Sequence, residues 1–123
     1  MKKYYLFLTY WPKTGNKRRT QAVFVSDTIA GEYTGTDILD CDRDYFNEGV
    51  AQGGLVETPE GDWYAVLMQD YEAVGRVPVL VPVHWKEDMP VFGENGMVPV
   101  SFKVPGTKNK VKPLYASDNF KNP

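Results

Sequence analysis

Valine occupies every second position from 77 to 83, within a β-prone run that spans residues 76–85. This period of two places the valines on one face of an extended strand. Pro78 and Pro82 alternate with the valines, and neither can donate the backbone hydrogen bond that a strand paired on both sides requires. The pattern therefore predicts a strand toward the outer edge of a sheet.

Two more β-prone runs precede this strand, at residues 53–58 and 63–69. The turn between them is Thr58-Pro59-Glu60-Gly61-Asp62, in which proline suits a φ near −65° and glycine suits a positive φ. This turn predicts a hairpin, and a loop at residues 70–75 then leads into the valine strand. Residues 53–85 are therefore expected to form three consecutive strands.

The rest of the chain also predicts an all-β protein. No window keeps apolar residues at the three-to-four spacing of a helix, and 11 glycines and 9 prolines separate short β-prone runs. Residues 4–10 and 20–26 are predicted strands with a basic turn between them, and residues 31–35 turn the chain toward Ile38 and Leu39.

Composition excludes several kinds of site and partner. The 14 basic and 16 acidic side chains leave a net charge of −2, which gives no bias toward nucleic acid. The single cysteine, Cys41, cannot form an internal disulfide, and the single histidine, His84, excludes a histidine-cluster metal site. The apolar runs are far shorter than the roughly 20 residues that span a bilayer. The opening residues accordingly predict a strand, with no membrane partner and no signal peptide.

Two segments of the chain resemble each other. Residues 3–8 match 62–67 at an offset of 59 (62 − 3), and residues 19–25 match 76–82 at an offset of about 57 (76 − 19). Each unit reads strand, loop, arginine, strand, and a period above 50 residues with several strands per unit is typical of β-propeller blades. The strand at 53–58 has no counterpart in the first unit, so we expect the chain to begin inside a blade.

Residues 49–92 resemble the fifth blade of glycoside hydrolase family 43, a family of five-bladed β-propellers. The resemblance is carried by G-G-L-V-E-T-P-E-G-D-W-Y, by A-V-G-R-V-P-V-L-V-P-V and by the pairing of Trp85 with Pro90. Residues 4–21 resemble the outer part of the fourth blade, and residues 117–120 resemble the opening of a β-sandwich domain that follows the propeller. This implies C-terminal blades over residues 1–105, then a linker and the start of another domain over 106–123.

The resemblance also implies a chemistry. Members of the family include β-xylosidases, α-arabinofuranosidases and arabinanases, which hydrolyse glycosidic bonds with inversion. Inversion uses an acid and a base whose carboxyl groups lie about 6.5–9.5 Å apart, leaving room for a water. No residue of this chain matches the family's catalytic positions, so no catalytic residue is assigned and the chain alone is expected to be inactive.

Three residues are candidates for substrate binding. Arg76 matches an arginine that hydrogen-bonds the sugar beside the scissile bond, although an arginine at a strand start can also form a structural ion pair. Gln52 stands where many members have a histidine that helps to hold calcium in the complete propeller, or it simply closes a turn. Trp11, at a strand end, can stack on a sugar ring or pack in the core.

Other acidic groups have simpler interpretations. Residues 40–44 begin like a calcium loop, but tyrosine and alanine occupy the positions that need glycine and glutamate, which favours a solvated turn. Glu57, Glu60 and Asp62 flank a tight turn and are expected to be exposed. A non-catalytic β-rich module that binds carbohydrate or protein stays open as an alternative function. Because two isolated blades leave apolar faces uncovered, we also expect self-association or association with the missing blades.

Overall fold

The structure is a computed structural model that describes residues 2–105, so the predicted linker and following domain at 106–123 lie outside the described residues. Seven strands form two antiparallel sheets, with the strand orders β1-β2-β3 and β4-β5-β6-β7. Apart from one short 3-10 helix, η1 (Glu72–Val74), the described chain contains only strands and loops. The all-β prediction is therefore confirmed.

The first sheet consists of β1 (Tyr4–Tyr10), β2 (Thr20–Ser26) and β3 (Thr34–Leu39). The first two strands have the predicted bounds, and β3 extends the expected turn toward Leu39 into a full strand. β1 pairs along its whole length with β2, from Tyr4 opposite Ser26 to Tyr10 opposite Thr20. Its other edge has no strand partner within residues 2–105.

The second sheet consists of β4 (Ala51–Glu57), β5 (Trp63–Asp70), β6 (Arg76–Lys86) and β7 (Met89–Phe92). The predicted turn joins β4 to β5, with Gly61 at φ 90° and the backbone N–H of Thr58 donating to the carbonyl of Asp62 at 2.8 Å. The three predicted strands are present: β5 and β6 each extend one residue further, and β4 starts two residues earlier and ends one residue earlier than predicted.

The edge position predicted for residues 76–85 is wrong for the strand as a whole, because β7 lies outside β6 and was not predicted. β7 is only four residues long and pairs with β6 over Val83–Lys86. Pro78 lies where β6 pairs with β5 alone. Pro82 lies just before the β6–β7 ladder, where its carbonyl accepts a hydrogen bond from the N–H of Gly93 at 2.8 Å, so neither missing N–H costs a ladder bond. The prolines thus indicated the part of β6 whose outer side has no strand partner, and not that β6 is the outermost strand of the sheet.

The order of the strands repeats between the two sheets. β1, β2 and β3 follow one another as β5, β6 and β7 do, whereas β4 has no counterpart in the described part of the first sheet. Trp85 lies opposite Pro90 in the β6–β7 ladder, as the sequence motif implied. Each sheet therefore has the layout of a propeller blade, complete in the second and without its first strand in the first.

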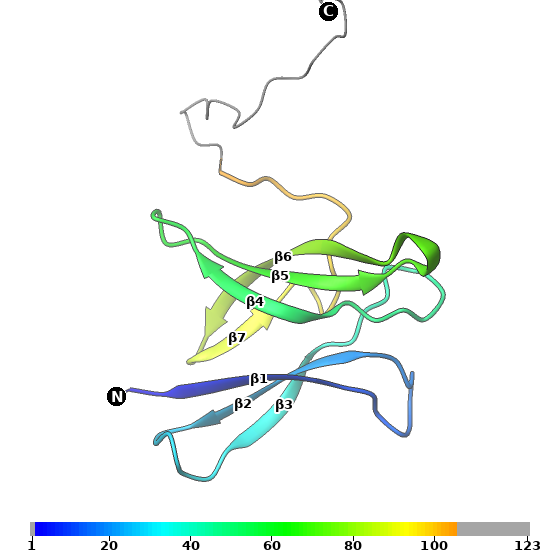
Figure 1. The fold of residues 1–123 in the computed structure, drawn as a ribbon. Coiled ribbons are helices and arrows are strands. Elements are labelled where there is room, and N and C mark those ends of the chain that lie inside the picture. Colours follow the sequence, from blue (N-terminus) through cyan, green and yellow to red (C-terminus); the bar gives the residue numbers. More distant parts are fainter. Residues whose placement is uncertain (1, 106–123) are drawn as a thin grey trace, which may run out of the picture.

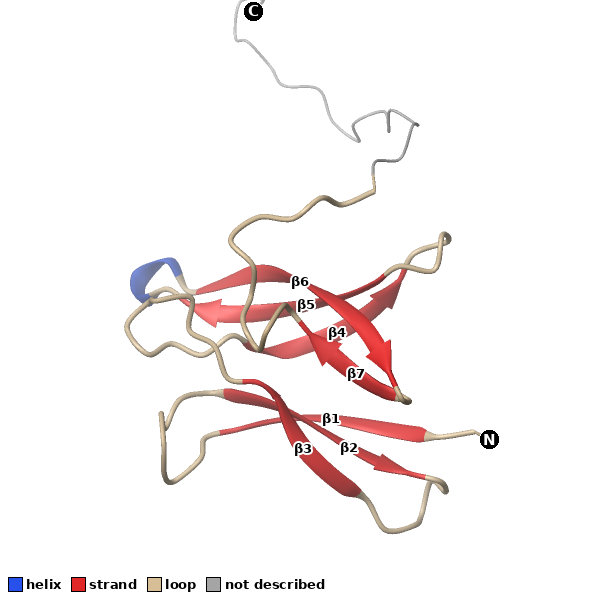
Figure 2. Ribbon diagram, turned by 180° about the vertical axis from the view of Figure 1, so that it is seen from behind, coloured by secondary structure: helices blue, strands red, loops and turns tan. Residues whose placement is uncertain are grey.

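The two sheets pack face to face, as Figures 1 and 2 show from opposite sides. Phe7 on β1 stacks against Phe92 on β7 with ring centroids 6.0 Å apart, and Tyr5 meets Trp85 edge to face at 5.2 Å. Buried apolar residues from both sheets and their connections fill the space between: Leu39, Cys41, Val50, Ala65, Leu67, Val79, Val81, Val83, Phe92 and Val98. This core fixes the position of one sheet on the other.

The outward faces of both sheets carry exposed apolar side chains, although Phe102 stacks on Tyr64 and covers part of the second sheet's face. Leu6 and Leu8 on β1 are 46% and 42% exposed, and Val66 on β5 and Leu80 on β6 are 44% and 40% exposed. Within residues 2–105, no helix is long and apolar enough to cross a membrane.

Candidate functional site

Several strand ends meet along one side of the paired sheets. The β1–β2, β3–β4 and β5–β6 connections lie together on that side, and the other three turns lie on the opposite side (Figure 1). Six residues at these strand ends, joined by contacts or by a groove that they line together, define what we call the shared edge: Trp11, Arg19, Gln21, Gln52, Asp70 and Arg76. The shared edge is therefore built by both sheets.

Asp70 ends β5 and lies between two arginines. One of its carboxylate oxygens, Oδ1, lies 3.3 Å from Nε of Arg76, its ladder neighbour at the start of β6. The other, Oδ2, accepts a hydrogen bond from Nη2 of Arg19, which lies just before β2 in the other sheet. Arg76 thus forms the ion pair considered as its structural alternative, and its side chain remains 51% exposed.

Trp11 extends beyond the end of β1 and is 61% exposed, so it is not a core residue. Its ring covers the guanidinium of Arg19, whose Cζ lies 5.4 Å from the ring centroid. Such a cation–π contact orients the indole while leaving its other side accessible. The predicted stacking role of Trp11 is therefore geometrically available.

Gln52 does not close a turn; it lies in a β-bulge within β4, where the register shifts between Ala51 and Gly53. Its φ is 69°, and its backbone N–H donates to the side-chain oxygen of Gln21 at 2.9 Å. The amide nitrogen of Gln21 in turn donates to the carbonyl of Leu8 at 3.0 Å. A bulge re-aims the residue it contains, and here it joins β4 to the first sheet.

A groove of about 380 Å³ lies between β1 and the start of β4. Trp11 and Phe7 supply its aromatic lining, the polar lining comes from Thr9, Gln21 and Gln52, and Leu8 and Gly53 complete it. The structure therefore brings Trp11 and Gln52 together. Arg76 does not line this groove and is connected to it through Asp70, Arg19 and Trp11.

The loop between β3 and β4 contains the sequence that begins like a calcium site. Asp40 and Asp42 both pair with Arg18, and Asp42 also accepts backbone hydrogen bonds from Asp44 and Asn47. Burial alone would raise the pKa of Asp40, but hydrogen bonds from Arg18 and Asn16 and the arginine charge lower it below its ordinary value. These carboxylates are engaged within the loop, and residues 2–105 contain no group of three or more His, Cys, Asp or Glu suited to a metal.

Gln69 holds this loop against β5. It is fully buried, and its amide nitrogen donates to the carbonyls of Asp42 at 2.6 Å and Glu48 at 2.8 Å. The loop is therefore fixed in place, and it holds the start of β4 and the nearby Gln52 in a defined position.

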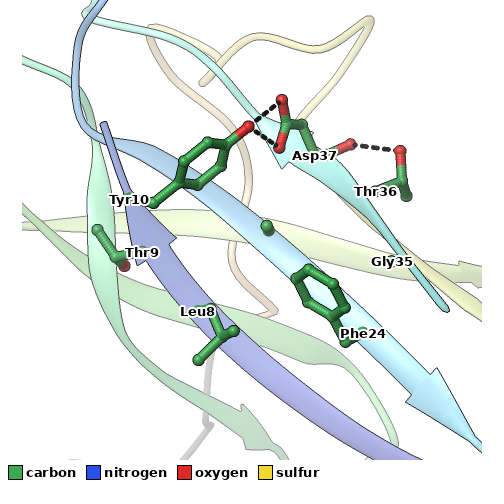
Figure 3. A pocket seen from close by; sticks show the side chains of 8 residues that line it. Leu8, Thr9, Tyr10, Phe24, Gly35, Thr36 and Asp37 are labelled. Carbon is green, nitrogen blue, oxygen red and sulfur yellow. Dashed lines mark hydrogen bonds between the residues drawn. The ribbon is translucent and has the colours of Figure 1, made fainter. Parts of the chain in front are cut away.

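A second hollow, of about 410 Å³, lies on the outward face of the first sheet and shares Leu8 and Thr9 with the groove (Figure 3). The ring of Phe24 lies over Gly35, where an added Cβ would be 2.4 Å from the ring. Tyr10 donates to the Asp37 carboxylate at 2.8 Å, a hydrogen bond that raises the pKa of the tyrosine. Apolar side chains dominate this hollow, which is part of the uncovered sheet face.

Sequence reasoning missed Arg19, Gln21 and Asp70 as members of the shared edge. The repeat contained a signal, since it aligned Arg19 with Arg76, and the structure joins these two arginines to one carboxylate. Glu57, Glu60 and Asp62 are exposed around the β4–β5 turn on the opposite side, as expected.

Comparison with known proteins agrees with this architecture. A Xylanibacter ruminicola protein named as a candidate β-xylosidase is 34% identical over 90 residues, which cover 73% of this chain and 17% of that protein. A solved structure of a bifunctional GH43-CE protein from Bacteroides eggerthii is 45% identical with a TM-score of 0.73, over 86% of this chain and 13% of that one. No family model matches the sequence.

A second solved structure is an engineered GH43 glycoside hydrolase described as having endo-xylanase and exo-arabinofuranosidase activity. It is 29% identical with a TM-score of 0.65, over 80% of this chain and 20% of its own. The chain thus spans less than a quarter of the length of each of these relatives. The blade layout agrees with these relatives, so the chain is similar in sequence and structure to part of the β-propeller of glycoside hydrolase family 43 proteins.

Proposed function

We propose that the chain is part of a glycoside hydrolase that acts on xylan- or arabinan-type oligosaccharides by inverting hydrolysis. The catalytic acid and base are supplied by residues outside this chain, because none of its residues matches their motifs. The activities named for two relatives, β-xylosidase in one and xylanase with arabinofuranosidase in the other, support this substrate class.

The observation that carries the proposal is the meeting of sugar-binding residue types at the shared edge. Trp11 offers an exposed indole, and Gln52 an exposed side-chain amide, in one groove, whereas the buried Gln21 amide is engaged with the backbone and holds Gln52 in place. Arg76 adds a half-exposed guanidinium, whose planar fork of donors suits paired hydroxyl groups. Carbohydrate recognition combines an apolar ring face with convergent polar groups, which is the combination that this edge offers.

We further propose that a calcium ion in the complete propeller takes the amide oxygen of Gln52 together with ligands from outside the described residues. Calcium is bound by six to eight oxygens. Gln52 has no imidazole, but its side-chain amide offers an oxygen that can be one of these ligands. The chain supplies no carboxylate cluster of its own within residues 2–105.

The uncovered outward face of the first sheet suggests how the chain associates. The repeat aligns Leu8 with Leu67, which is buried between the sheets, so the outward face of the first sheet is equivalent to a face that is covered in the second. We propose that this face is covered by another sheet, either from the rest of the propeller or from a second copy of the chain.

Two measurements on residues 1–123 test the proposed function. Assays with aryl xylosides and arabinosides should show no turnover above buffer, because the acid and base are absent. An NMR titration with xylobiose and arabinobiose should shift the resonances of the shared edge and leave those of the β4–β5 turn unchanged. Turnover that survives repurification, or shifts confined to other surfaces, would contradict the proposal.

A further inference from the structure

We propose that Asp70 is a positioning residue for Arg76, and that buried Arg19 fixes Asp70 in place. This inference rests on the proposed function, since it concerns the arginine assigned to sugar binding. The observation behind it is a single carboxylate with one oxygen on each guanidinium.

Arg19 is the fixed end of this arrangement. It is 6% exposed, and Trp11 covers its guanidinium. Its backbone packs closely against Gly49, since a Cβ added to Gly49 would lie 1.9 Å from the carbonyl oxygen of Arg19. Its Nε and Nη1 are buried and have no hydrogen-bond partner in the described chain. A buried cation is costly unless it is paired, so Arg19 depends strongly on the Asp70 carboxylate.

Asp70 transmits this constraint to Arg76. Asp70 and Arg76 are paired residues at the end of the β5–β6 ladder, so the backbone pairing itself places their side chains next to each other. The contact uses Nε of Arg76, and within residues 2–105 its two terminal amino groups make no hydrogen bond. These groups remain available for a ligand while Nε restricts the orientation of the guanidinium.

The internal repeat relates the two arginines that contact Asp70. Arg19 and Arg76 occupy equivalent places before or at the start of a strand, yet one is buried and the other is half exposed. The buried copy anchors the carboxylate, and the exposed copy receives its orientation from it. An arginine held in one orientation loses less side-chain entropy when a sugar binds than a free one does.

Side-chain NMR relaxation on residues 1–123 tests this directly. In the wild-type chain the Nε–H of Arg76 should have an order parameter above about 0.6, the upper limit for a flexible group. Asp70→Asn should lower it below that value without a matching change in backbone order. Asp40→Asn is the control, because it removes a carboxylate that pairs with an arginine not linked to Arg76.

The outcomes separate this inference from the proposed function. A wild-type Arg76 Nε–H with the mobility of a free side chain, or an unchanged order parameter in Asp70→Asn, would overturn the positioning role. If Asp70→Asn does not fold, the wild-type value and the variant Arg19→Lys, which should also lower Arg76 order, decide in its place.

Ligand affinity provides the second readout. Asp70→Asn should weaken xylobiose binding by about fivefold, because binding must then also order the freed Arg76 side chain, while Asp40→Asn binds like the wild type. Wild-type affinity in a folded Asp70→Asn chain would count against the positioning role. Absence of xylobiose binding by the wild-type chain would refute the proposed function instead, and the order parameter of Arg76 would still decide the role of Asp70.

Discussion

Replacing Gln69 by leucine should destabilise the chain and loosen the loop that leads into the shared edge. The Gln69 amide donates two buried hydrogen bonds, of 2.6 and 2.8 Å, to the carbonyls of Asp42 and Glu48. Each such bond contributes about 1–1.5 kcal/mol, and leucine leaves both carbonyls without this donor. The expected loss in the free energy of unfolding is therefore about 2–3 kcal/mol.

Urea denaturation followed by tryptophan fluorescence measures this loss at a fixed protein concentration. Gln52→Leu is the matched control, because it makes the same change at an exposed position whose side chain forms no hydrogen bond within the described chain. It should change the unfolding free energy by less than about 0.5 kcal/mol. A Gln69→Leu chain within that same margin of the wild type would refute the reasoning.

Three further predictions concern other parts of the chain. Because its folded pKa is lowered, Asp40 contributes stability that is present above its ordinary pKa of 3.8 and is lost as pH falls through the lower folded value. Asp40→Asn should therefore cost under about 1 kcal/mol at pH 7, and progressively less in unfolding experiments below that ordinary pKa; a cost that does not change with pH would contradict this. Gly53→Ala should cost about 2 kcal/mol or more in thermal unfolding, since its Cβ would lie 1.8 Å from the carbonyl oxygen of Val66, whereas Gly54→Ala meets no atom within 4 Å and should be tolerated. Light scattering at micromolar concentration should give a mass above the 13.9 kDa of one chain, and Leu8→Lys on the uncovered face should shift it toward the monomer; a monodisperse wild-type monomer would contradict the open-face interpretation.

Short-range patterns predicted most of the strands. Alternation and turn chemistry gave β1 and β2 with the bounds found in the structure, and Gly61 adopts the positive φ that its turn requires. β7 was missed because four residues between two turns carry too little periodicity to identify a strand. The missing N–H groups of Pro78 and Pro82 were interpreted for the whole strand, although β7 pairs with only one end of it.

The shared edge was only partly predictable. Motif matching selected Trp11, Gln52 and Arg76, each considered by itself. The contacts that connect them depend on how one sheet packs on the other, as in the bond from Gln52 to the Gln21 side chain. Asp70 gave no signal, because an aspartate at a strand end is common and its importance comes from two arginines 51 and 6 positions away (70 − 19 and 76 − 70). Such long-range pairings are visible only once the sheets are assembled.

The most direct test of the central claim, that the shared edge binds the sugar of a family 43 hydrolase, is the kinetics of a chimaera. Residues 2–105 would replace the corresponding segment of the Bacteroides eggerthii GH43 protein, which shares the fold at 45% identity. In an active chimaera, Arg76→Ala should lower kcat/KM for aryl xylosides or arabinosides by about tenfold or more, about 1.4 kcal/mol of lost transition-state stabilisation. Glu60→Ala, on the opposite turn, should leave kcat/KM unchanged. Equal kcat/KM values for the chimaera and its Arg76→Ala variant would contradict the claim.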